Sequence, residues 1–591
     1  MSAEKLITDH IDIWTSAVQA KSASGRGSSK KRELYGIKKL RELILELAVR
    51  GKLVPQDPND EPASVLLERI ATEKAQLVKD KKIKKPKKLP EISDEEKSFI
   101  LPVGWEWAHL QDLTTYIQRG KGPKYAETGS VQVVSQKCVQ NSGFDLSPAR
   151  YVTDESLEKY QDERYLQDND ILWNSTGTGT VGRANVITNI PEKRIVADSH
   201  VTVIRPNNCY SRFLWCFIMA PGIQARIQPD HENALVSGST KQVELNTSSV
   251  LSVVVPVAPV EEQHRIVAKV DELMTLCDQL EQQTEASIEA HQVLVTTLLE
   301  TLTNSADAEE LMQNWARISE HFDTLFTTEE SIDQLKQTIL QLAVMGKLVP
   351  QDPNDEPAAK LLERIAEEKA QLVKEKKIKK QKALPPIAED EKPFELPSGW
   401  EWCRFGELGY DLGGGTPSKA NASYWGGDIP WVSPKDMKRD FIDSAIDTVT
   451  EKAVEETTIK LIPNNSLLMV VRGMILAHSF PVALTKKTLV INQDMKALVF
   501  SQLHSDFLLL VMKAMRDSVV GLVDHSSHGT CKLVSEKLWA FPLAIPPYRE
   551  QENITNMVNE FLAICDELKL RLGDSRQTQL QLTDAIVEQA L

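Results

Sequence analysis

The 591-residue sequence lacks several features that would place it in familiar classes of protein. Its seven cysteines form no Cys-x-x-Cys pair and no regular spacing, which argues against a disulfide framework and fits a reducing cytosol. No run approaches eighteen apolar residues, and the N-terminus has no apolar core followed by a cleavage site. We therefore expect no membrane span and no signal peptide, and a cytoplasmic protein of several globular domains.

The sequence also lacks a catalytic constellation. It contains no GxxxxGK[ST] phosphate-binding loop and no GxSxG nucleophile elbow. Gly177–Gly182 fits GxGxxG, but a proline and strand-like pairs follow instead of the helix that a dinucleotide site needs, so a hairpin is the better interpretation. Ile545–Tyr548 lacks the polar first residue of the amino-methyltransferase signature. His525–Cys531 has ligand-like spacing but would need Asp524 or a distant fourth ligand, so we expect no metal site.

Positive charge is in deficit over the whole chain. The 69 Lys and Arg against 84 Asp and Glu give a net charge of −15, so contact with nucleic acid would need local basic surfaces. Lys79–Lys88 carries seven Lys and one Asp, and Lys374–Lys382 carries six Lys and one Glu. Each tract is either a solvated helix end and linker or an arm that contacts DNA phosphates.

What the sequence does contain is an internal repeat. Gly51–Ile70 and Gly346–Ile365 differ at only two of twenty positions, at an offset of 295 residues. A second repeated block, Pro259–Gln263 and Pro547–Gln551, lies near the end of each half at an offset of 288. The stretches between these blocks have diverged almost beyond recognition. Two near-identical frames around two dissimilar inserts indicate a domain duplication in which one scaffold presents two different surfaces.

Apolar residues at heptad spacing follow each closing block. The first copy has Ile266, Leu273, Leu280 and Leu294 at one seam position and Val270, Cys277 and Leu298 at the other; the second copy has Ile554, Phe561, Leu568 and Leu582, with Val558, Cys565, Leu572 and Ile586. This pattern predicts two long antiparallel helices, about 261–302 and within 546–591, packed as a coiled-coil spacer. A helical hairpin inside a larger core is the alternative.

Shorter elements are predicted in the frames and the inserts. Helices are expected over Ile37–Val49, Pro62–Val78, Phe213–Met219, Ile332–Val344, Pro357–Val373 and Phe507–Met515, and strands over Val131–Val134, Val186–Ile187, Val201–Ile204 and Leu467–Val471. The fold class is therefore α+β, with two mixed α/β domains and an internal pseudo-two-fold repeat. The predicted regions are an N-terminal helical region (1–98), a first domain (99–255), a central helical region (256–394), a second domain (395–545) and a C-terminal helix (546–591).

The motifs of the second half carry a family resemblance. LPSGWEW, GGTPS, YWGGDIPWVSPKDM, INQD and PPYREQ before a heptad helix resemble the specificity subunit of type I restriction-modification enzymes. The repeated GKLVPQDPNDEP block resembles the type IB branch of that family. The first half departs from the pattern, because GKGPK replaces GGTPS and YWGGDIPW is missing.

The resemblance implies a non-catalytic chain whose two target recognition domains each bind one half of a bipartite, asymmetric site in double-stranded DNA. It implies that the long helices set the spacer and dock two methyltransferase (modification) subunits, to which restriction (helicase-nuclease) subunits are added. No cofactor is expected on this chain; S-adenosylmethionine, ATP and Mg are expected on the partner subunits. The competing hypothesis is a two-headed coiled-coil scaffold that binds proteins or glycans instead of DNA.

Cations in the loops of the inserts are the candidate DNA contacts. Glycine lets backbone amides approach phosphates closely, and Arg and Lys reach guanine edges. The candidates are Arg119, Lys121, Lys124, Arg183, Lys419, Lys435, Arg439 and Arg472, with Lys124 aligned to Lys419. A surface cation without a special role is the alternative for each of them.

Overall fold

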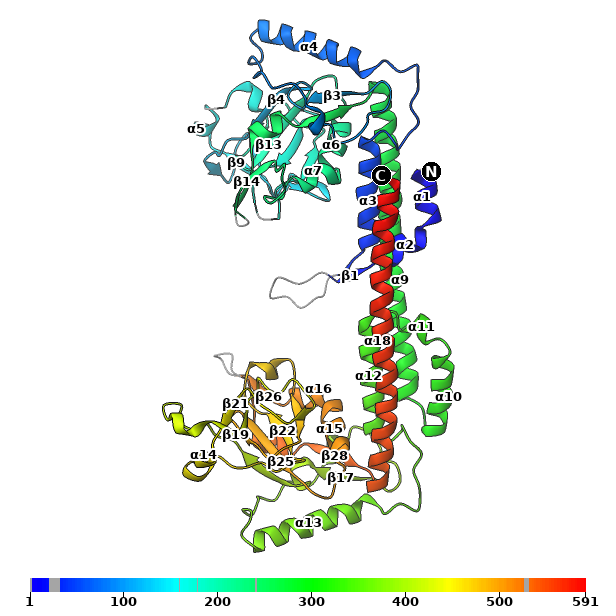
Figure 1. Ribbon diagram of the computed structural model, residues 1–591, viewed down its shortest axis with the longest axis vertical. Coiled ribbons are helices and arrows are strands. Elements are labelled where there is room, and N and C mark those ends of the chain that lie inside the picture. Colours follow the sequence, from blue (N-terminus) through cyan, green and yellow to red (C-terminus); the bar gives the residue numbers. More distant parts are fainter. Residues whose placement is uncertain (1–2, 21–31, 159, 178, 240–241, 526–530) are drawn as a thin grey trace. The chain divides into compact units, whose positions relative to one another are not determined.

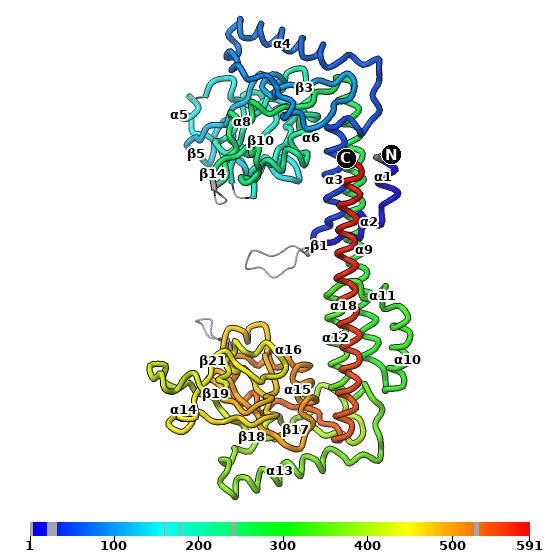
Figure 2. Tube along the Cα trace, viewed as in Figure 1, coloured from blue at the N-terminus to red at the C-terminus, as the bar shows by residue number. Residues whose placement is uncertain are grey.

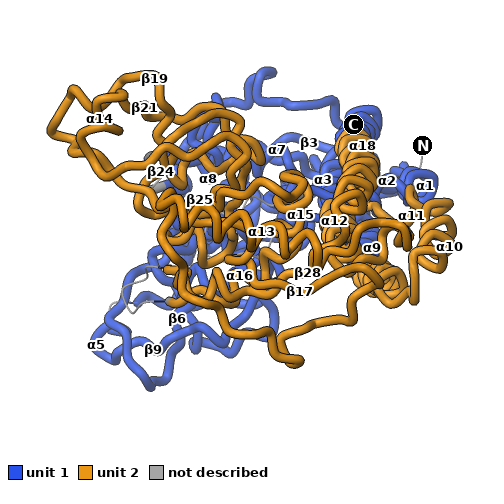
Figure 3. The backbone as a smooth tube through the Cα atoms, turned by 90° about the horizontal axis from the view of Figure 1, so that it is seen from below, with its two compact units in different colours: residues 1–287, 575–591 blue, residues 288–574 orange. Residues whose placement is uncertain are grey.

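A computed structural model describes residues 3–20, 32–158, 160–177, 179–239, 242–525 and 531–591 (Figure 1). The chain divides into two compact units, residues 1–287 with 575–591 and residues 288–574 (Figure 3). Each unit combines long helices with mixed sheets, which confirms the predicted α+β class with two mixed α/β domains. Within the described ranges, no helix has both the length and the apolarity that a membrane span requires.

Two helices of more than forty residues contribute to both units. α9 is Val260–Thr303 and α18 is Tyr548–Ala590. Each follows directly on a short strand, β16 (Val254–Val257) or β28 (Pro542–Ile545). The first unit takes the N-terminal part of α9 and the C-terminal part of α18, and the second unit takes the remainder of each. The two long helices predicted from heptad spacing are confirmed.

In the first unit, α3 (Tyr35–Val49) lies beside both long helices (Figure 2). Lys52, which follows α3, donates a hydrogen bond to a backbone oxygen of Leu591, the residue after α18. Gln56 donates to Glu262 at the start of α9, at 3.1 Å. The start of α9 and the end of α18 therefore lie at the same end of α3, so the long helices are antiparallel in this unit, as predicted.

The second unit repeats this arrangement with the long helices in exchanged roles. α12 (Glu329–Val344) takes the place of α3. Lys347 donates to the carbonyl oxygen of Thr303 at the end of α9, at 2.9 Å, and Gln351 donates to Glu550 at the start of α18, at 3.2 Å. The same two contacts thus close both units, and the sequence repeat is also a structural repeat.

Two further frame helices, α4 (Ala63–Lys79) and α13 (Ala358–Lys374), agree with the predicted ones. The frame also contains four helices that were not predicted, α1 (Ala3–Asp9), α2 (Ile11–Ser16), α10 (Ala308–Ser319) and α11 (Phe322–Leu325). Proline precedes α4 and α13 directly, because its fixed φ suits the residue at which a helix begins. Gly51 and Gly346, which follow α3 and α12, have φ of +65° and +69° and provide the left-handed residue that ends a helix.

The apolar seam of each long helix contains one irregular step, and here the heptad prediction is wrong. Leu294 is 49% exposed, whereas its neighbour Val295 is 1% exposed; in α18 Leu582 is 45% exposed and Thr583 is fully buried. From Leu280 to Val295, the buried and half-buried positions of α9 are 280, 281, 284, 288, 291 and 295. The step from 280 to 291 is eleven residues long, and heptad spacing resumes after it. An unbroken heptad would place polar Ser287 in the seam. Because the seam shifts by one residue to Ile288, the hydroxyl group of Ser287 stays exposed to water.

We expect the free energy of unfolding to depend on Val295 and hardly at all on Leu294. Val295→Gln would bury an amide with no partner among the apolar residues around it, so the thermal midpoint should fall by several degrees. Leu294→Gln should change it by about 1 °C or less. Differential scanning calorimetry of the two variants measures the thermal midpoints. A larger decrease for Leu294→Gln than for Val295→Gln would contradict the irregular step and support an unbroken heptad seam.

Each mixed domain is built on a central sheet, which is antiparallel apart from the parallel pair of β23 and β20 in the second domain. In the first domain its order is β11-β10-β13-β4, from Ala184–Val186, Ile171–Asn174, Val201–Pro206 and Thr114–Arg119. In the second domain the order is β18-β25-β22-β23-β20, from Tyr410–Gly413, Met495–Val499, Leu467–Val470, Val482–Thr485 and Phe441–Ile442. The order β4-β13-β10-β11 thus corresponds to β18-β25-β22-β23, although the sequences have diverged.

A second, smaller sheet accompanies each central sheet. The first domain has β12-β6-β9-β5, from Ile195–Ala197, Gln132–Val134, Arg150–Val152 and Tyr125–Ala126; the second has β21-β19-β24, from Asp447–Val449, Trp425–Val432 and Val490–Ile491. One helix in each domain, α6 (Ser211–Met219) or α15 (Ser505–Ala514), matches its predicted position. β10 and β11 pair as a hairpin, which confirms that interpretation of the GxGxxG segment.

The first mixed domain is fastened to the first turn of α9 by two adjacent side chains. The indole N–H of Trp105 donates to Glu262 at 3.0 Å. Gln263, fully buried, accepts from the backbone N–H of Tyr210, the residue that precedes α6, at 2.9 Å. The Glu-Gln pair of the repeated closing block therefore holds both the frame and the domain against the long helix.

The second domain repeats this joint, and there the carboxyl group is more strongly perturbed. Trp400 donates to Glu550 at 3.0 Å, and Gln551 accepts from the backbone of His504 at 2.9 Å. Burial raises the pKa of Glu550 to about 7, although its two hydrogen-bond donors oppose the shift. Burial also raises the pKa of Glu262, where the nearby charge of Arg265 opposes it.

This perturbation predicts a pH dependence of stability. Because the pKa of Glu550 rises from 4.5 to about 7 on folding, its contribution is fully present below the lower value and is lost as the pH rises toward 7. Glu550→Gln keeps the oxygen that accepts from Trp400 and Gln351 but cannot ionise. The thermal midpoint of this variant should fall less than that of the wild type between pH 5 and pH 7.5, by about 2–4 °C. Equal falls in both proteins, with exposed Glu552→Gln as the control, would contradict the assignment.

Candidate nucleic-acid interface

In the first domain, several loops meet at one edge of the central sheet. β4 ends at Arg119, which lies opposite Thr202, and β10 ends at Asn174, which lies opposite Val201. Three strand ends therefore lie side by side at this edge. The hairpin of β14 (Val236–Ser239) and β15 (Gln242–Leu245) reaches it through a bridge between Thr176 and Glu244. We call this end of the sheet, in either domain, the loop edge.

The second domain has a loop edge of the same construction. Gly413 at the end of β18 lies opposite Lys496, and Val470 at the end of β22 lies opposite Met495. The hairpin of β26 (Val523–His525) and β27 (Cys531–Leu533) joins it through a bridge between Arg472 and Lys532. The two inserts therefore present corresponding sets of loops.

Of the ligand-like segment His525–Cys531, the structure describes His525 at the end of β26 and Cys531 at the start of β27. Residues 526–530 lie outside the described residues. Among the residues that are described, no three His, Cys, Asp or Glu side chains are grouped as metal ligands would be. The seven cysteines are all buried and unbridged, each within its own part of the core.

A glycine is required where the chain leaves the first strand at each loop edge. A Cβ atom on Gly120 would lie 2.1 Å from the carbonyl oxygen of Asp198, and one on Gly414 would lie 1.9 Å from that of Asn492. Either contact is far inside van der Waals distance, so any other residue would displace the turn packed against it. Gly120 and Gly414 therefore occupy equivalent positions in the two domains, which establishes how the residues of the two loop edges correspond.

One pair of equivalent positions makes a side-chain contact in both domains, with different chemistry. In the first domain, Thr176 Oγ1 lies 2.5 Å from His200 Nδ1. In the second domain, Arg472 Nη1 lies 3.9 Å from Asp494 Oδ1. Thr176 stands two residues after the end of β10, and Arg472 stands two residues after the end of β22. Likewise, His200 stands two residues after Asp198, whose carbonyl oxygen faces Gly120, and Asp494 stands two residues after Asn492, whose carbonyl oxygen faces Gly414. A contact between a hydroxyl group and an imidazole in one domain is thus replaced by an ion pair in the other.

Two of the predicted contacts of the first domain lie at its loop edge. Arg119 is half-buried and forms an ion pair with Glu244, and its Nε donates to the carbonyl oxygen of Ser199. Burial lowers the pKa of its guanidinium. Lys121 is exposed on the next loop, whose backbone is held by hydrogen bonds to Ala197 and from Tyr160. Arg119 is therefore engaged with protein groups, and Lys121 lies on the outer surface of this edge.

The other two predicted contacts of the first domain have local partners. Lys124 lies 3.2 Å from Glu155, with both side chains exposed. Arg183 follows the glycine-rich turn of the β10–β11 hairpin and donates to Gln140 and to the carbonyl oxygen of Gly179, the latter at 2.7 Å. The guanidinium of Arg183 therefore fixes the turn to its neighbour, a role that the sequence did not suggest.

In the second domain, Lys435 and Arg472 lie at the loop edge and Lys419 does not. Lys435 is exposed in the turn after β19, beside Asn492, whose backbone N–H bonds to the last residue of that strand. Lys419 is exposed near the start of β19, the end remote from the loop edge. Arg439 precedes β20 and donates to Ser444 at 3.0 Å.

The sequence reasoning missed Lys137 and misaligned Lys124. Lys137 follows β6 as Lys435 follows β19, since β6 pairs with β12 and β19 pairs with β24 in parallel register. The shared Val-Ser-x-Lys at Val134 and Val432 was a signal that could have found it. By contrast, the carbonyl oxygen of Lys124 accepts from the residue before α5 (Asp154–Leu157), as that of Tyr424 accepts from the residue before α14 (Glu451–Glu456). Tyr424, not Lys419, therefore corresponds to Lys124.

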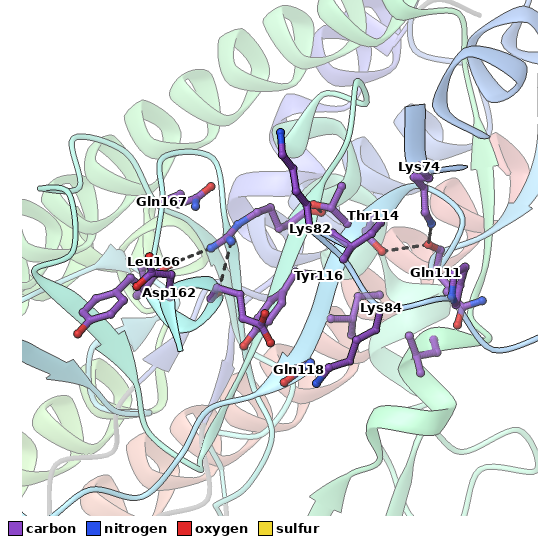
Figure 4. Close-up of a pocket in the computed structure, with 18 of the residues that line it drawn as sticks. Lys74, Lys82, Lys84, Gln111, Thr114, Tyr116, Gln118, Asp162, Leu166 and Gln167 are labelled. Atoms are coloured by element: carbon purple, nitrogen blue, oxygen red, sulfur yellow. Dashed lines mark hydrogen bonds between the residues drawn. The ribbon is translucent and has the colours of Figure 1, made fainter. Parts of the chain in front are cut away.

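The first lysine tract passes along the first domain and borders a cavity of about 910 Å³ (Figure 4). Lys74 donates to the backbone carbonyl oxygen of Gln111 at 2.6 Å. The side-chain amide of Gln111 donates in turn to the backbone carbonyl oxygen of Lys87 at 2.8 Å. Beyond the lysine tract, the lining carries the acidic residues Asp162, Glu163, Asp168 and Glu192 together with the cations Lys193 and Arg205. A lining of mixed charge does not form a continuous track for phosphates, which favours the linker interpretation for this tract.

The comparisons with known proteins agree with this architecture. Residues 102–290 and 397–572 match the family model of the type I restriction modification DNA specificity domain. Over the full length of both chains, the sequence is 42% identical to the specificity subunit of the type I restriction enzyme EcoEI and 41% identical to that of EcoAI, both from Escherichia coli.

Solved structures provide a weaker likeness. The HsdS subunit from Thermoanaerobacter tengcongensis is 16% identical, with a TM-score of 0.41, over 84% of this chain and 98% of that one. A chain from a structure of the assembly and conformational transition of the type I R-M system has a TM-score of 0.45 over 83% and 98%. Because the family model matches more than half of the sequence and the full-length relatives exceed 40% identity, the chain belongs to the specificity subunits of type I restriction enzymes.

Proposed function

We propose that this chain selects the DNA sequence for a type I restriction-modification complex, with each mixed domain binding one half of a bipartite, asymmetric target. The observation that carries the proposal is the pair of loop edges. One backbone arrangement, fixed at Gly120 and Gly414, bears Thr176 and His200 in one domain and Arg472 and Asp494 in the other. Identical supports with unlike contact residues are what two different half-sites require.

The long helices suit the role of a spacer and of a docking surface for two methyltransferase subunits. Each helix contributes to both units, so the same two helices belong to the frame of each domain. Because the chain carries a net charge of −15, most of the phosphate contacts would come from partner subunits. The chain itself would act without catalysis: S-adenosylmethionine would bind the modification subunits, and ATP and Mg the restriction subunits.

The experiment that tests this function is a map of methylated adenines. The chain would be produced with its modification subunits in a host without other adenine methylation, and the genome sequenced by a method that detects the methyl group. We expect one motif with two unlike specified parts and an unspecified gap, absent from cells without this chain. A continuous motif, or the same motif without the chain, would contradict the proposal, as would binding of S-adenosylmethionine by the purified chain alone.

A further inference from the structure

When the two loop edges are compared, some equivalent positions carry the same residue and others carry different residues. Lys137 and Lys435 are both exposed lysines in equivalent turns, and Gly120 and Gly414 are equivalent glycines. DNA phosphates are the same in every sequence, so contacts to them can be identical in two domains with different targets. Contacts to bases, by contrast, must differ between two domains that bind different sequences. The positions that differ while keeping one geometry are therefore the candidates for base recognition.

Arg472 is held at such a position by its backbone. Its N–H and that of Val471 both donate to the carbonyl oxygen of Asp494, at 3.2 and 2.8 Å, and Arg472 forms a bridge with Lys532 on the other side. The Cα of Arg472 is thus fixed between two segments, while its side chain remains 50% exposed. A side chain that must match a base edge needs a fixed origin of this kind.

The carboxylate beside Arg472 is itself oriented. Asp494 receives a hydrogen bond from the side chain of Asn492 at 3.4 Å, and its backbone N–H donates to the same side chain at 3.0 Å. The carboxylate lies 3.9 Å from the guanidinium, close enough to orient it by charge and too far for a hydrogen bond. In the described part of the chain, no residue accepts a hydrogen bond from this guanidinium, and its side chain is half exposed.

This geometry favours a base over a phosphate as the ligand of Arg472. A guanidinium directed by a neighbouring carboxylate presents two parallel N–H groups, which match O6 and N7 of guanine in the major groove. A cation that contacts phosphate needs no such orientation, and an adjacent carboxylate would repel the phosphate. Lys435, exposed at the same edge, has the character of a phosphate contact.

The first domain has a different pair at these positions. His200 is exposed, and its backbone N–H donates to the side chain of Asp198 at 2.8 Å, as Asp494 does to Asn492. The contact with Thr176 engages one ring nitrogen and leaves the other for a ligand. A single ring nitrogen cannot form the two parallel bonds of a guanidinium, so this pair would select a different base.

We propose that Thr176 with His200, and Arg472 with Asp494, are the specificity-determining pairs of the two domains, and that Arg472 recognises a guanine in the half-site of the second domain. This inference rests on the proposed function, which it refines from a domain to a residue.

The test compares Arg472→Ala and Arg472→Lys with Lys435→Ala in the assembled methyltransferase complex. Both Arg472 variants should lose discrimination by about tenfold or more at one guanine of one half-site, because lysine cannot supply the paired bonds. The other half-site and the gap should be unchanged. Lys435→Ala should keep the motif and lower the methylation rate at all sites alike. His200→Ala should relax only the opposite half-site, which provides a second variant in a separate domain.

The outcomes separate this inference from the function that it refines. Absence of a bipartite motif with the wild-type chain would contradict the proposed function itself. A wild-type bipartite motif that stays intact in both Arg472 variants would overturn only the inference. A uniform loss of methylation with an unchanged motif, in variants that still assemble and melt like the wild type, would assign Arg472 to a phosphate and overturn it as well.

Discussion

The hydrogen bond from a buried tryptophan to a buried glutamate, at the first turn of each long helix, is the contact on which the placement of each domain depends. A buried carboxyl group is costly unless donors reach it, and Trp105 or Trp400 is one of the two that do. The adjacent glutamine binds the start of the domain's own helix. This requirement explains why GWEW and the Glu-Gln pair are kept in both copies while the residues between them changed.

Within the inserts, the scaffold and the contact surface are separated in the same way. Gly120 and Gly414 are kept because a turn packs against each of them, and the strand order of the central sheet is kept with them. The side chains just beyond the strand ends bear no such packing constraint. They can exchange Thr for Arg and His for Asp without disturbing the sheet, so a new contact surface can arise on an unchanged fold.

Much of the frame could be predicted from the sequence. Proline starts, glycine stops and apolar periodicity are local signals, and they placed α3, α4, α12 and α13 within a few residues. The phase of α9 beyond Leu280 could not be predicted from heptads alone, because the polar Ser287 turns the helix by an extra step. The different contacts that the loop cations make could not be predicted from the sequence either. Arg183 and Arg472 are both loop cations of the inserts, and only the fold shows that Arg183 is bonded to its own loop while Arg472 is half exposed beside Asp494.

The central claim is that each insert recognises its half-site independently of the other. The most direct test replaces residues 105–255 with the corresponding insert of the EcoEI subunit, whose full-length similarity supplies compatible frames. Methylated adenines are then mapped in cells that carry the modification subunits. The account predicts that one half-site changes to a new sequence while the other half-site and the length of the gap stay the same. A change in both half-sites, or in neither, would contradict it.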